Sequence, residues 1–402
     1  MRVRFFVAAL LLMAACGGDN VLHTCDIREP SCQFDVFLAV QDVRGNLWDP
    51  WLEPPLMRVI SEAEYRAELI AADEQTLRDV GVDYLTPALQ LLHMIDPNEA
   101  PSAATDFKVL TVAAYYEATS KRVTIVDHGA DQRSDAAQTL AHELVHAAQD
   151  RDIGLGRLYQ HGTNADSFNA LAALVEGEAV LYELLVDAKQ KNIPKAGIDW
   201  QGLLLRSGIE VRGQTFMDRS PYRVATTQLA YPLGGFYLSQ AYTSGGPLAL
   251  RRMFDHPPLS AARFMADLGA AHDRVPPAWS CNTPQAPPGF QLQIGDELGA
   301  FSMYALATRI TETEDDAWQL AQQWTGDRFY VYTNPSDASA LAVVWQLRMQ
   351  NPVAAATFQA SLARVPWAPG IQTSLDGDTL HIIASSRALE PSYAAWSQCP
   401  PL

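Results

Sequence analysis

The stretch TLAHELVHAAQDRD, residues 139–152, carries two histidines four positions apart, with a glutamate directly after the first. Small and apolar residues surround them, a pattern typical of a buried helix, and we expect this helix to run from about Ser134 to Arg151. Because residues i and i+4 lie on one face of a helix, His142 and His146 point the same way. The stretch therefore places two imidazoles side by side on one helix.

This spacing is the one at which two imidazole nitrogens bind a single zinc ion. Glu143 lies about 100° round the helix from His142, so its carboxylate can reach a water on the metal without binding the ion. Zinc lowers the pKa of such a water to about 7, and a carboxylate can then take its proton as a general base. The alternative interpretation is a helix that carries a chance pair of surface or core histidines.

A catalytic zinc site needs a third protein ligand and one open position. The metzincin pattern would place a third histidine six residues after His146, where Asp152 stands, so the sequence excludes that class. Another common solution is a glutamate on the next helix, which we expect from Ala165 to about Lys191. That segment offers Glu176, Glu178 and Glu183.

Two observations favour different glutamates as the third ligand. The residues three, four and seven positions away from Glu178 on either side are all apolar, and a carboxylate on such a stripe is costly unless something such as a metal pairs with it. Glu176 instead has mostly small residues one turn away on either side, namely Ala172, Ala173, Ala179 and Val180. Those residues would let the helix of His142 approach closely.

The combination of HELVH, residues 142–146, with EGEA, residues 176–179, resembles the gluzincin metallopeptidases. In that family the glutamate before the glycine is the third zinc ligand. The resemblance implies Zn²⁺ on His142, His146 and Glu176, with Glu143 as general base. We therefore expect Glu176 as the third ligand, with Glu178 as the alternative, and in the first case Glu178 would be a neighbour that orients a ligand histidine.

A closer similarity is to a group of exported bacterial and archaeal proteins that are presumed to be peptidase-like from their motifs. The matching stretches are VAAYYEATSKRVTIV (112–126), AHELVHAAQD (141–150), LVEGEA (174–179) and AYPLGGFYLSQAY (230–242). Weaker similarity extends the match over most of the chain after about residue 55. The similarity implies the fold and the metal more directly than the substrate.

Two β-rich runs flank the polar turn EATSK, so we expect a hairpin from about Val109 to Val126. In zincin-like proteins an edge strand lies above the active helix, and a substrate can pair with it as an added strand. KRVTIV, residues 121–126, is the candidate for this edge strand. The alternative is that it belongs only to the core of a sheet.

The negative charge that develops during peptide hydrolysis needs a hydrogen-bond donor besides zinc. Related peptidases often use a tyrosine or a histidine, and Tyr231, in AYPLGG, is the first candidate. His128, His161 and His256 are alternatives, and His161 is also the nearest candidate for a fourth metal ligand. Each of the four could equally be structural.

The first fifteen residues have the pattern of a secretory signal. Arg2 and Arg4 precede an apolar run that is too short to span a membrane, and small residues follow it. The residues before Cys16 resemble a bacterial lipobox, which implies a lipid on Cys16 and, in a Gram-negative cell, the outer membrane. The alternative is an ordinary signal peptide with a chance cysteine.

Four further cysteines, an even number, predict two disulfides in an exported protein. Of the three possible pairings we favour Cys25–Cys32 together with Cys281–Cys399. The first would close a small N-terminal loop, and the second would attach the C-terminal tail to the body.

Several segments outside these motifs also have a predicted structure. Ser61 followed by Glu64 is a capping box and predicts the start of a helix. Towards the C-terminus we expect helices around 298–314 and 354–363, with strands around 328–333 and 340–349. The proline-rich stretch 276–288 is typical of a boundary between lobes.

The predicted fold is α+β and zincin-like: mostly helical, with a small sheet or hairpin packed on the helix of His142 and a helical C-terminal lobe. Its parts are a signal peptide (1–15), a tether with a small disulfide loop (16–34), a metallopeptidase domain (35–275) and the C-terminal lobe (276–402).

The formal net charge is −17 and no basic face is visible, which excludes nucleic acid as a partner. We therefore expect an exported, lipid-anchored zinc metallopeptidase that acts on a peptide or protein. The alternative is a catalytically silent envelope lipoprotein that retains a structural zinc site or a binding surface.

Overall fold

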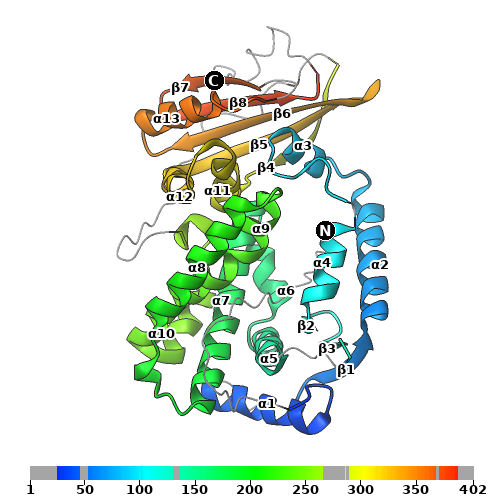
Figure 1. Cartoon of the computed structure of the whole chain (residues 1–402), viewed down its shortest axis with the longest axis vertical. Coiled ribbons are helices and arrows are strands. Elements are labelled where there is room, and N and C mark those ends of the chain that lie inside the picture. The colour runs from blue at the N-terminus through cyan, green and yellow to red at the C-terminus, as the bar shows by residue number, and fades with distance from the viewer. Residues whose placement is uncertain are drawn as a thin grey trace.

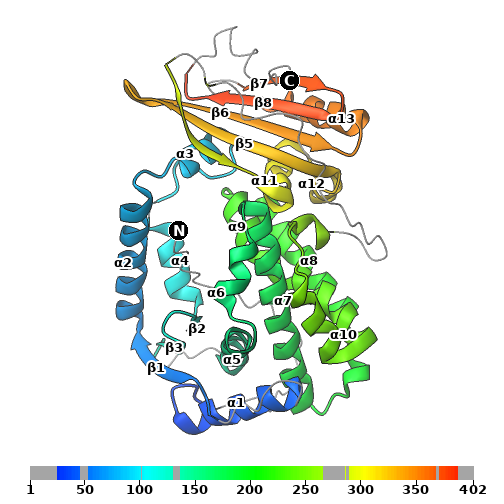
Figure 2. The ribbon, with the colours of Figure 1, turned by 180° about the vertical axis from the view of Figure 1, so that it is seen from behind.

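The computed structural model describes residues 25–45, 53–100, 102–129, 136–265, 286, 289–367 and 371–387. The predicted α+β class is confirmed: helices pack with a three-stranded and a five-stranded sheet (Figures 1 and 2). The disulfide Cys25–Cys32 is present as predicted. The signal segment, Cys16 and the pair Cys281–Cys399 lie outside the described residues.

The helices are α1 (Pro30–Arg44), α2 (Glu62–Val80), α3 (Leu85–Leu91), α4 (Ala103–Thr111), α5 (Ala136–Asp152), α6 (Leu155–Leu158), α7 (Ala165–Gln190), α8 (Trp200–Met217), α9 (Pro221–Gln228), α10 (Ala230–Asp255), α11 (Gly299–Ile310), α12 (Glu314–Ala321) and α13 (Pro352–Leu362). The strands are β1 (Leu56–Ser61), β2 (Ala114–Glu117), β3 (Arg122–Asp127), β4 (Gln291–Asp296), β5 (Trp324–Asn334), β6 (Asp337–Met349), β7 (Ile371–Asp376) and β8 (Thr379–Ser385). Within these parts of the chain, no helix combines the length and the apolar character needed to cross a bilayer.

The smaller sheet has the strand order β1-β3-β2, with β3 parallel to β1 and antiparallel to β2. The predicted hairpin is therefore confirmed, but it begins at Ala114 rather than at Val109, because residues 103–111 form α4. The prediction that KRVTIV is an edge strand is wrong. Both of its sides are already paired, because β1, about sixty residues earlier in the chain, adds a third strand that a local hairpin pattern does not reveal. The edge strand that packs on α5 is β2.

The predicted capping box is confirmed at the start of α2. The Glu64 amide donates to Ser61 Oγ (3.2 Å), and the Ser61 amide donates to Glu64 Oε2 (2.8 Å). Each side chain thus satisfies a backbone donor that the first helical turn would leave unpaired. This cap fixes the point at which β1 ends and α2 begins.

Three helices, α5, α7 and α10, build the layer that carries His142, His146 and the glutamates of EGEA, and α1 packs against the first two. α7 begins at a second capping box, in which Asn164 and Ser167 exchange hydrogen bonds. Its middle third is buried on all sides, and leucines on both α5 and α7 fill the shared core. The part of the expected tether that the structure describes is packed here too, because Ile27 and Cys32 are buried beside α1.

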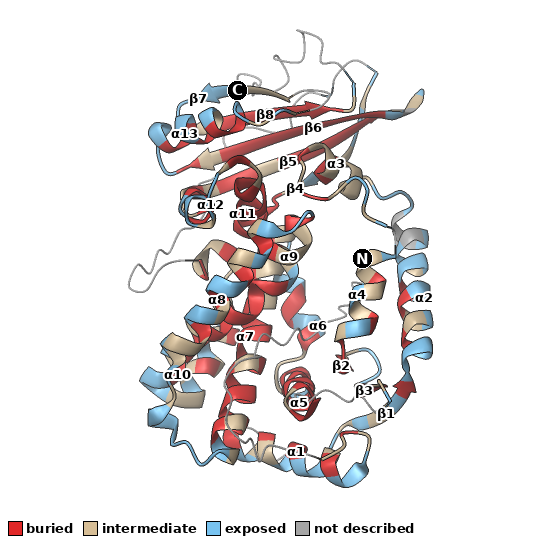
Figure 3. Ribbon diagram, viewed as in Figure 1, coloured by how far each residue is buried: buried red, intermediate tan, exposed pale blue. Residues whose placement is uncertain are grey.

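The predicted helical C-terminal lobe is wrong. Residues 291–385 contain a five-stranded antiparallel sheet of order β4-β5-β6-β8-β7, and α11, α12 and α13 share one apolar core with it. Figure 3 shows β5, β6 and β8 largely buried, whereas β7 at the edge is exposed. The sequence predicted β5 and β6, but β4 and β7 are short and only partly buried, so their alternation of apolar and polar residues is weak.

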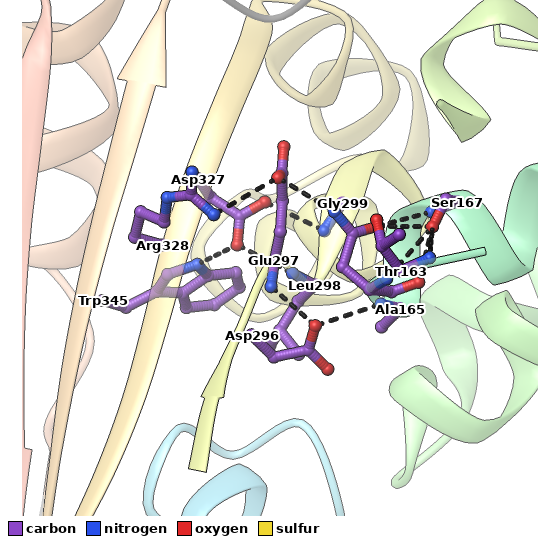
Figure 4. A network of polar contacts seen from close by, with 11 residues as sticks. Thr163, Ala165, Ser167, Asp296, Glu297, Leu298, Gly299, Asp327, Arg328 and Trp345 are labelled. Carbon is purple, nitrogen blue, oxygen red and sulfur yellow. Dashed lines mark hydrogen bonds and ion pairs between the residues drawn. The ribbon is translucent and has the colours of Figure 1, made fainter. Parts of the chain in front are cut away.

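The loop between β4 and α11 joins this sheet to the start of α7 (Figure 4). Asp296 Oδ1 accepts a hydrogen bond from the Ala165 amide (3.1 Å), and the Glu297 carbonyl accepts one from the Asp166 amide (3.0 Å). The buried carboxylate of Asp327 accepts from the first two amides of the turn that opens α11 (both 2.9 Å). Backbone donors at two helix starts are thus satisfied by acceptors from the sheet region.

Candidate metal site

α5 positions the two histidines as the i, i+4 spacing predicts, in a helix that runs from Ala136 to Asp152 and is buried along nearly its whole length. Small residues on α5 let the neighbouring helices approach closely. The residues His142, Glu143, His146 and Glu176 are all at most 3% exposed. Four polar side chains buried away from solvent require hydrogen-bond partners or a bound ion.

The structure brings Glu176, rather than Glu178, to the two histidines. Oε2 of Glu176 lies 3.1 Å from Nε2 of His142 and 3.4 Å from Nε2 of His146. One ligand atom from each of these three residues lies within 4.8 Å of the others, so the group could hold a metal ion. Within the described chain it is the only such group of three or more.

Glu178 does not contact the histidines directly; it is linked to His146 through the side chain of Gln149. Nε2 of Gln149 donates to Glu178 Oε2 (2.8 Å) and to the carbonyl of Val175 (2.9 Å). Because both of its amide hydrogens are used in this way, the Gln149 oxygen must face His146, whose Nδ1 lies 2.8 Å away. Nδ1 of His146 therefore carries the hydrogen, and Nε2 is the nitrogen that faces Glu176 and would bind a metal ion.

His142 is oriented in a similar way, by a carboxylate beside its Nδ1. Nδ1 of His142 lies 3.2 Å from Oε2 of Glu183, one helical heptad beyond Glu176 on α7. A carboxylate at this place accepts the Nδ1 hydrogen, which leaves Nε2 of His142 as the nitrogen that faces Glu176 and would bind a metal ion.

The donor set fits a cation. Two imidazole nitrogens and a carboxylate oxygen meet in a buried space, and Nε2 of His146 has no hydrogen-bond partner in the described chain. Burial lowers the pKa of His142, but hydrogen bonds to Glu176 and Glu183 raise it to about 10. Burial raises the pKa of Glu176, but the charges of the two histidines lower it to about 2. The carboxylates around the imidazoles thus favour positive charge at this place, which a bound cation would supply once the two histidines release their extra protons and become ligands.

Glu143 lies beside this group without joining it. Its Oε2 accepts a hydrogen bond from the backbone amide of Tyr116 on β2 (2.8 Å), whereas its Oε1 is buried and lacks a partner among the described residues. Burial raises the pKa of Glu143 to about 7, although the two histidines lower it. A carboxyl with such a pKa can both take and return a proton near neutral pH.

Tyr231, predicted from AYPLGG, lies in the site. Its ring is stacked against His142 at a centroid distance of 5.8 Å. Burial raises the pKa of Tyr231 well above its usual value, and the charge of Glu176 and a hydrogen bond to that carboxylate add to the effect. The hydroxyl therefore donates to Glu176 in this structure.

The three candidate histidines outside the motif are not part of the group. His161 and His256 are exposed. His128 instead contacts Glu62 (2.6 Å) and the carbonyl of Val112 (2.9 Å), near the start of α2.

Four residues contact or surround the site in ways that the sequence analysis did not predict: Tyr116, Gln149, Tyr159 and Glu183, of which it considered only Glu183, as a candidate third ligand. Two of them carried a signal. Gln149 follows His146 by three positions and Glu183 follows Glu176 by seven, so both lie on the faces that meet. Tyr159, which is buried and whose pKa is raised by burial and by Glu176, follows no such periodicity.

The model of one family, described as a domain of unknown function (DUF8575), matches residues 291–387. This segment comprises β4 to β8 with α11, α12 and α13, and it does not include α5, α7 or α10. No curated protein and no solved structure matches the chain.

Proposed function

We propose that this protein is a zinc-dependent metallopeptidase of the gluzincin type, with the ion held by His142, His146 and Glu176. One observation carries the proposal. Two imidazole nitrogens converge on the Glu176 carboxylate, while Oε1 of Glu143 lies buried beside them without a partner among the described residues. A metal site that only stabilises the fold has no use for this unpartnered oxygen of Glu143.

Bound zinc would lower the pKa of a coordinated water and polarise the substrate carbonyl. Glu143 takes the proton of the attacking water on Oε1, because Oε2 is held by the Tyr116 amide. The same carboxyl then gives this proton to the leaving amine. The Tyr231 hydroxyl donates a hydrogen bond to Glu176. A rotation of this side chain would let the same hydroxyl donate to the developing oxyanion instead.

Zinc binds nitrogen and oxygen donors of this kind, and so do several other transition metals. The resemblance to gluzincins supports zinc among them. The same resemblance supports a peptide or protein as substrate. If a substrate pairs with the small sheet, the strand it joins is β2, not KRVTIV.

The test is the metal content and the peptidase activity of the purified chain. We expect about one zinc per chain, lost in His146→Ala and Glu176→Gln. Glu178→Gln is the matched control, and it should retain zinc because its carboxylate reaches His146 only through Gln149. Glu143→Gln should retain zinc and lose hydrolysis of a peptide library. Continued hydrolysis by Glu143→Gln would defeat the mechanism.

The alternative function is a silent lipoprotein with a structural zinc site, and the observation that favours it is the near-complete burial of the four side chains. A substrate must reach Glu143, whereas a structural ion needs no access. Stoichiometric zinc in a wild-type chain that cleaves no member of a broad peptide library would support this alternative.

Export and lipid anchoring through Cys16 are part of the proposal, and the disulfide Cys25–Cys32 supports an oxidising compartment. Radiolabelled palmitate should be incorporated by the wild type and not by Cys16→Ala. Release of the wild type from membranes by high salt alone would contradict a lipid anchor.

A further inference from the structure

We infer that Asp150, acting through Tyr116, is a positioning residue for Glu143: the three residues form a clasp that fixes β2 above α5 and holds the general base. This inference rests on the proposed function. The clasp assigns a role to the final aspartate of HELVHAAQD, which the metal site itself does not use.

Tyr116 is bound to α5 at two points. Its backbone amide donates to Oε2 of Glu143 (2.8 Å), and its hydroxyl donates to Oδ2 of Asp150 (2.7 Å). Glu143 and Asp150 are seven residues apart, so they lie on one face of α5, about 10 Å apart along its axis. A single tyrosine therefore spans two turns of the helix that carries the site.

The pairing of β2 leaves Tyr116 free to do this. The amide of Val126 donates to the carbonyl of Ala113, which makes these two residues a hydrogen-bonded pair. Because such pairs alternate along antiparallel strands, Tyr116, opposite Val123, is in a pair without mutual hydrogen bonds. Its amide and carbonyl thus face the outer edge of the sheet, where α5 lies.

Asp150 is itself held firmly. It is 4% exposed, and its Oδ1 accepts from the amide of Leu155 (3.0 Å), which follows the end of α5. Lys121, in the turn between β2 and β3, forms an ion pair with it from the solvent side. The hairpin is therefore attached to α5 at its strand through Tyr116 and at its turn through Lys121.

This attachment determines which oxygen of Glu143 is available. β2 has four residues and one strand partner, so its sheet pairing alone does little to fix its distance from α5. While the clasp is closed, the Tyr116 amide occupies Oε2 and leaves Oε1 for the proton. Without it, the strand can withdraw and the carboxylate can rotate away from the attacking water.

The experiment uses the zinc-loaded full chain with Tyr116→Phe and Asp150→Asn. We measure kcat and KM on a cleaved peptide, the zinc content, and hydrogen–deuterium exchange at the amide of residue 116. Tyr304→Phe is the matched control, because Tyr304 is also buried and its hydroxyl donates to the Arg212 carbonyl (2.9 Å) in a different core.

We expect Tyr116→Phe to lower kcat about tenfold, with KM within about twofold. Zinc should stay at one per chain, and exchange at residue 116 should become faster. Asp150→Asn should have the same effects to a smaller degree, because its amide oxygen still accepts from the hydroxyl. Tyr304→Phe should leave kcat and the exchange unchanged.

An unchanged kcat in Tyr116→Phe, or a fall equal to that in Tyr304→Phe, would overturn the positioning role. Unchanged exchange at residue 116 would overturn the clasp itself. A wild type that binds zinc but cleaves no peptide would instead overturn the proposed function, and the exchange measurement would still decide whether the clasp exists.

Discussion

Gly177 and Gly234 bring α7 and α10 into backbone contact. A Cβ on Gly177 would lie 2.2 Å from the carbonyl carbon of Gly234, and a Cβ on Gly234 would lie 1.8 Å from the carbonyl oxygen of Ala173. Gly177 directly follows Glu176, and Gly234 is one helical turn after Tyr231. The crossing of these two helices therefore places the Tyr231 hydroxyl against the Glu176 carboxylate.

Gly234→Ala should separate α7 from α10 and destabilise the fold, because backbone atoms cannot move aside for the new methyl group. We expect the free energy of unfolding to fall by about 1–3 kcal/mol or more, as overpacked cores do. Denaturant titration measures this. Gly213→Ala on α8 is the control: its Cβ meets nothing within 4 Å, so the change should be neutral or stabilising.

Gln149→Leu should weaken metal binding while α5 stays folded. The variant loses the oxygen that accepts from His146 Nδ1, and the imidazole is then free to turn or to change tautomer. Loss of such a supporting contact typically lowers metal affinity about 10–100-fold. Competition with a chromophoric chelator measures the affinity. Gln138→Leu, on the same helix but bonded to Asp187, should bind zinc as the wild type does.

We expect the free energy of unfolding to depend on pH through Asp166, which lies where α7 meets the C-terminal sheet. Burial raises its pKa to about 7, although hydrogen bonds from Ser260 and the Ala261 amide lower it. The folded state thus binds a proton that the unfolded chain, with a pKa of about 3.9, releases earlier. The contribution of Asp166 is fully present below about pH 4 and is lost as the pH rises through about 7, with a slope of at most about 1.4 kcal/mol per pH unit.

Asp166→Asn should flatten this part of the stability curve, because an amide keeps the acceptor oxygen for Ala261 and Ala300 and does not titrate. Chemical denaturation at several pH values between 4 and 8 provides the comparison. An equal slope in the wild type and in Asp166→Asn would refute the assignment to this carboxyl.

Replacing both Cys25 and Cys32 with alanine should lower the free energy of unfolding by about 2 kcal/mol, as expected for closing so short a loop. The loss should appear as easier opening of α1, since Cys32 and Val36 are buried against α5 and α7. Proteolysis at sites within α1 should be faster in the variant. A wild type treated with reductant should behave in the same way.

The sequence by itself determined the features that depend on neighbours along the chain. The i, i+4 spacing of His142 and His146 defines a helix face, and the capping box at Ser61 defines the start of a helix. The turn EATSK likewise defines a hairpin. These patterns follow from the 3.6-residue and two-residue periods of the backbone, which operate within a few positions.

Only the tertiary structure shows which of Glu176 and Glu178 lies beside the two histidines. Residues two positions apart on a helix point about 200° apart, so only one of the two glutamates can face the histidines directly, and the sequence pattern alone left both open. The crossing at Gly177 rotates α7 so that Glu176 meets both histidines and Glu178 reaches His146 through Gln149. The central place of β3 and the five-stranded sheet have the same origin: each depends on pairing between segments far apart in the chain, which no local period encodes.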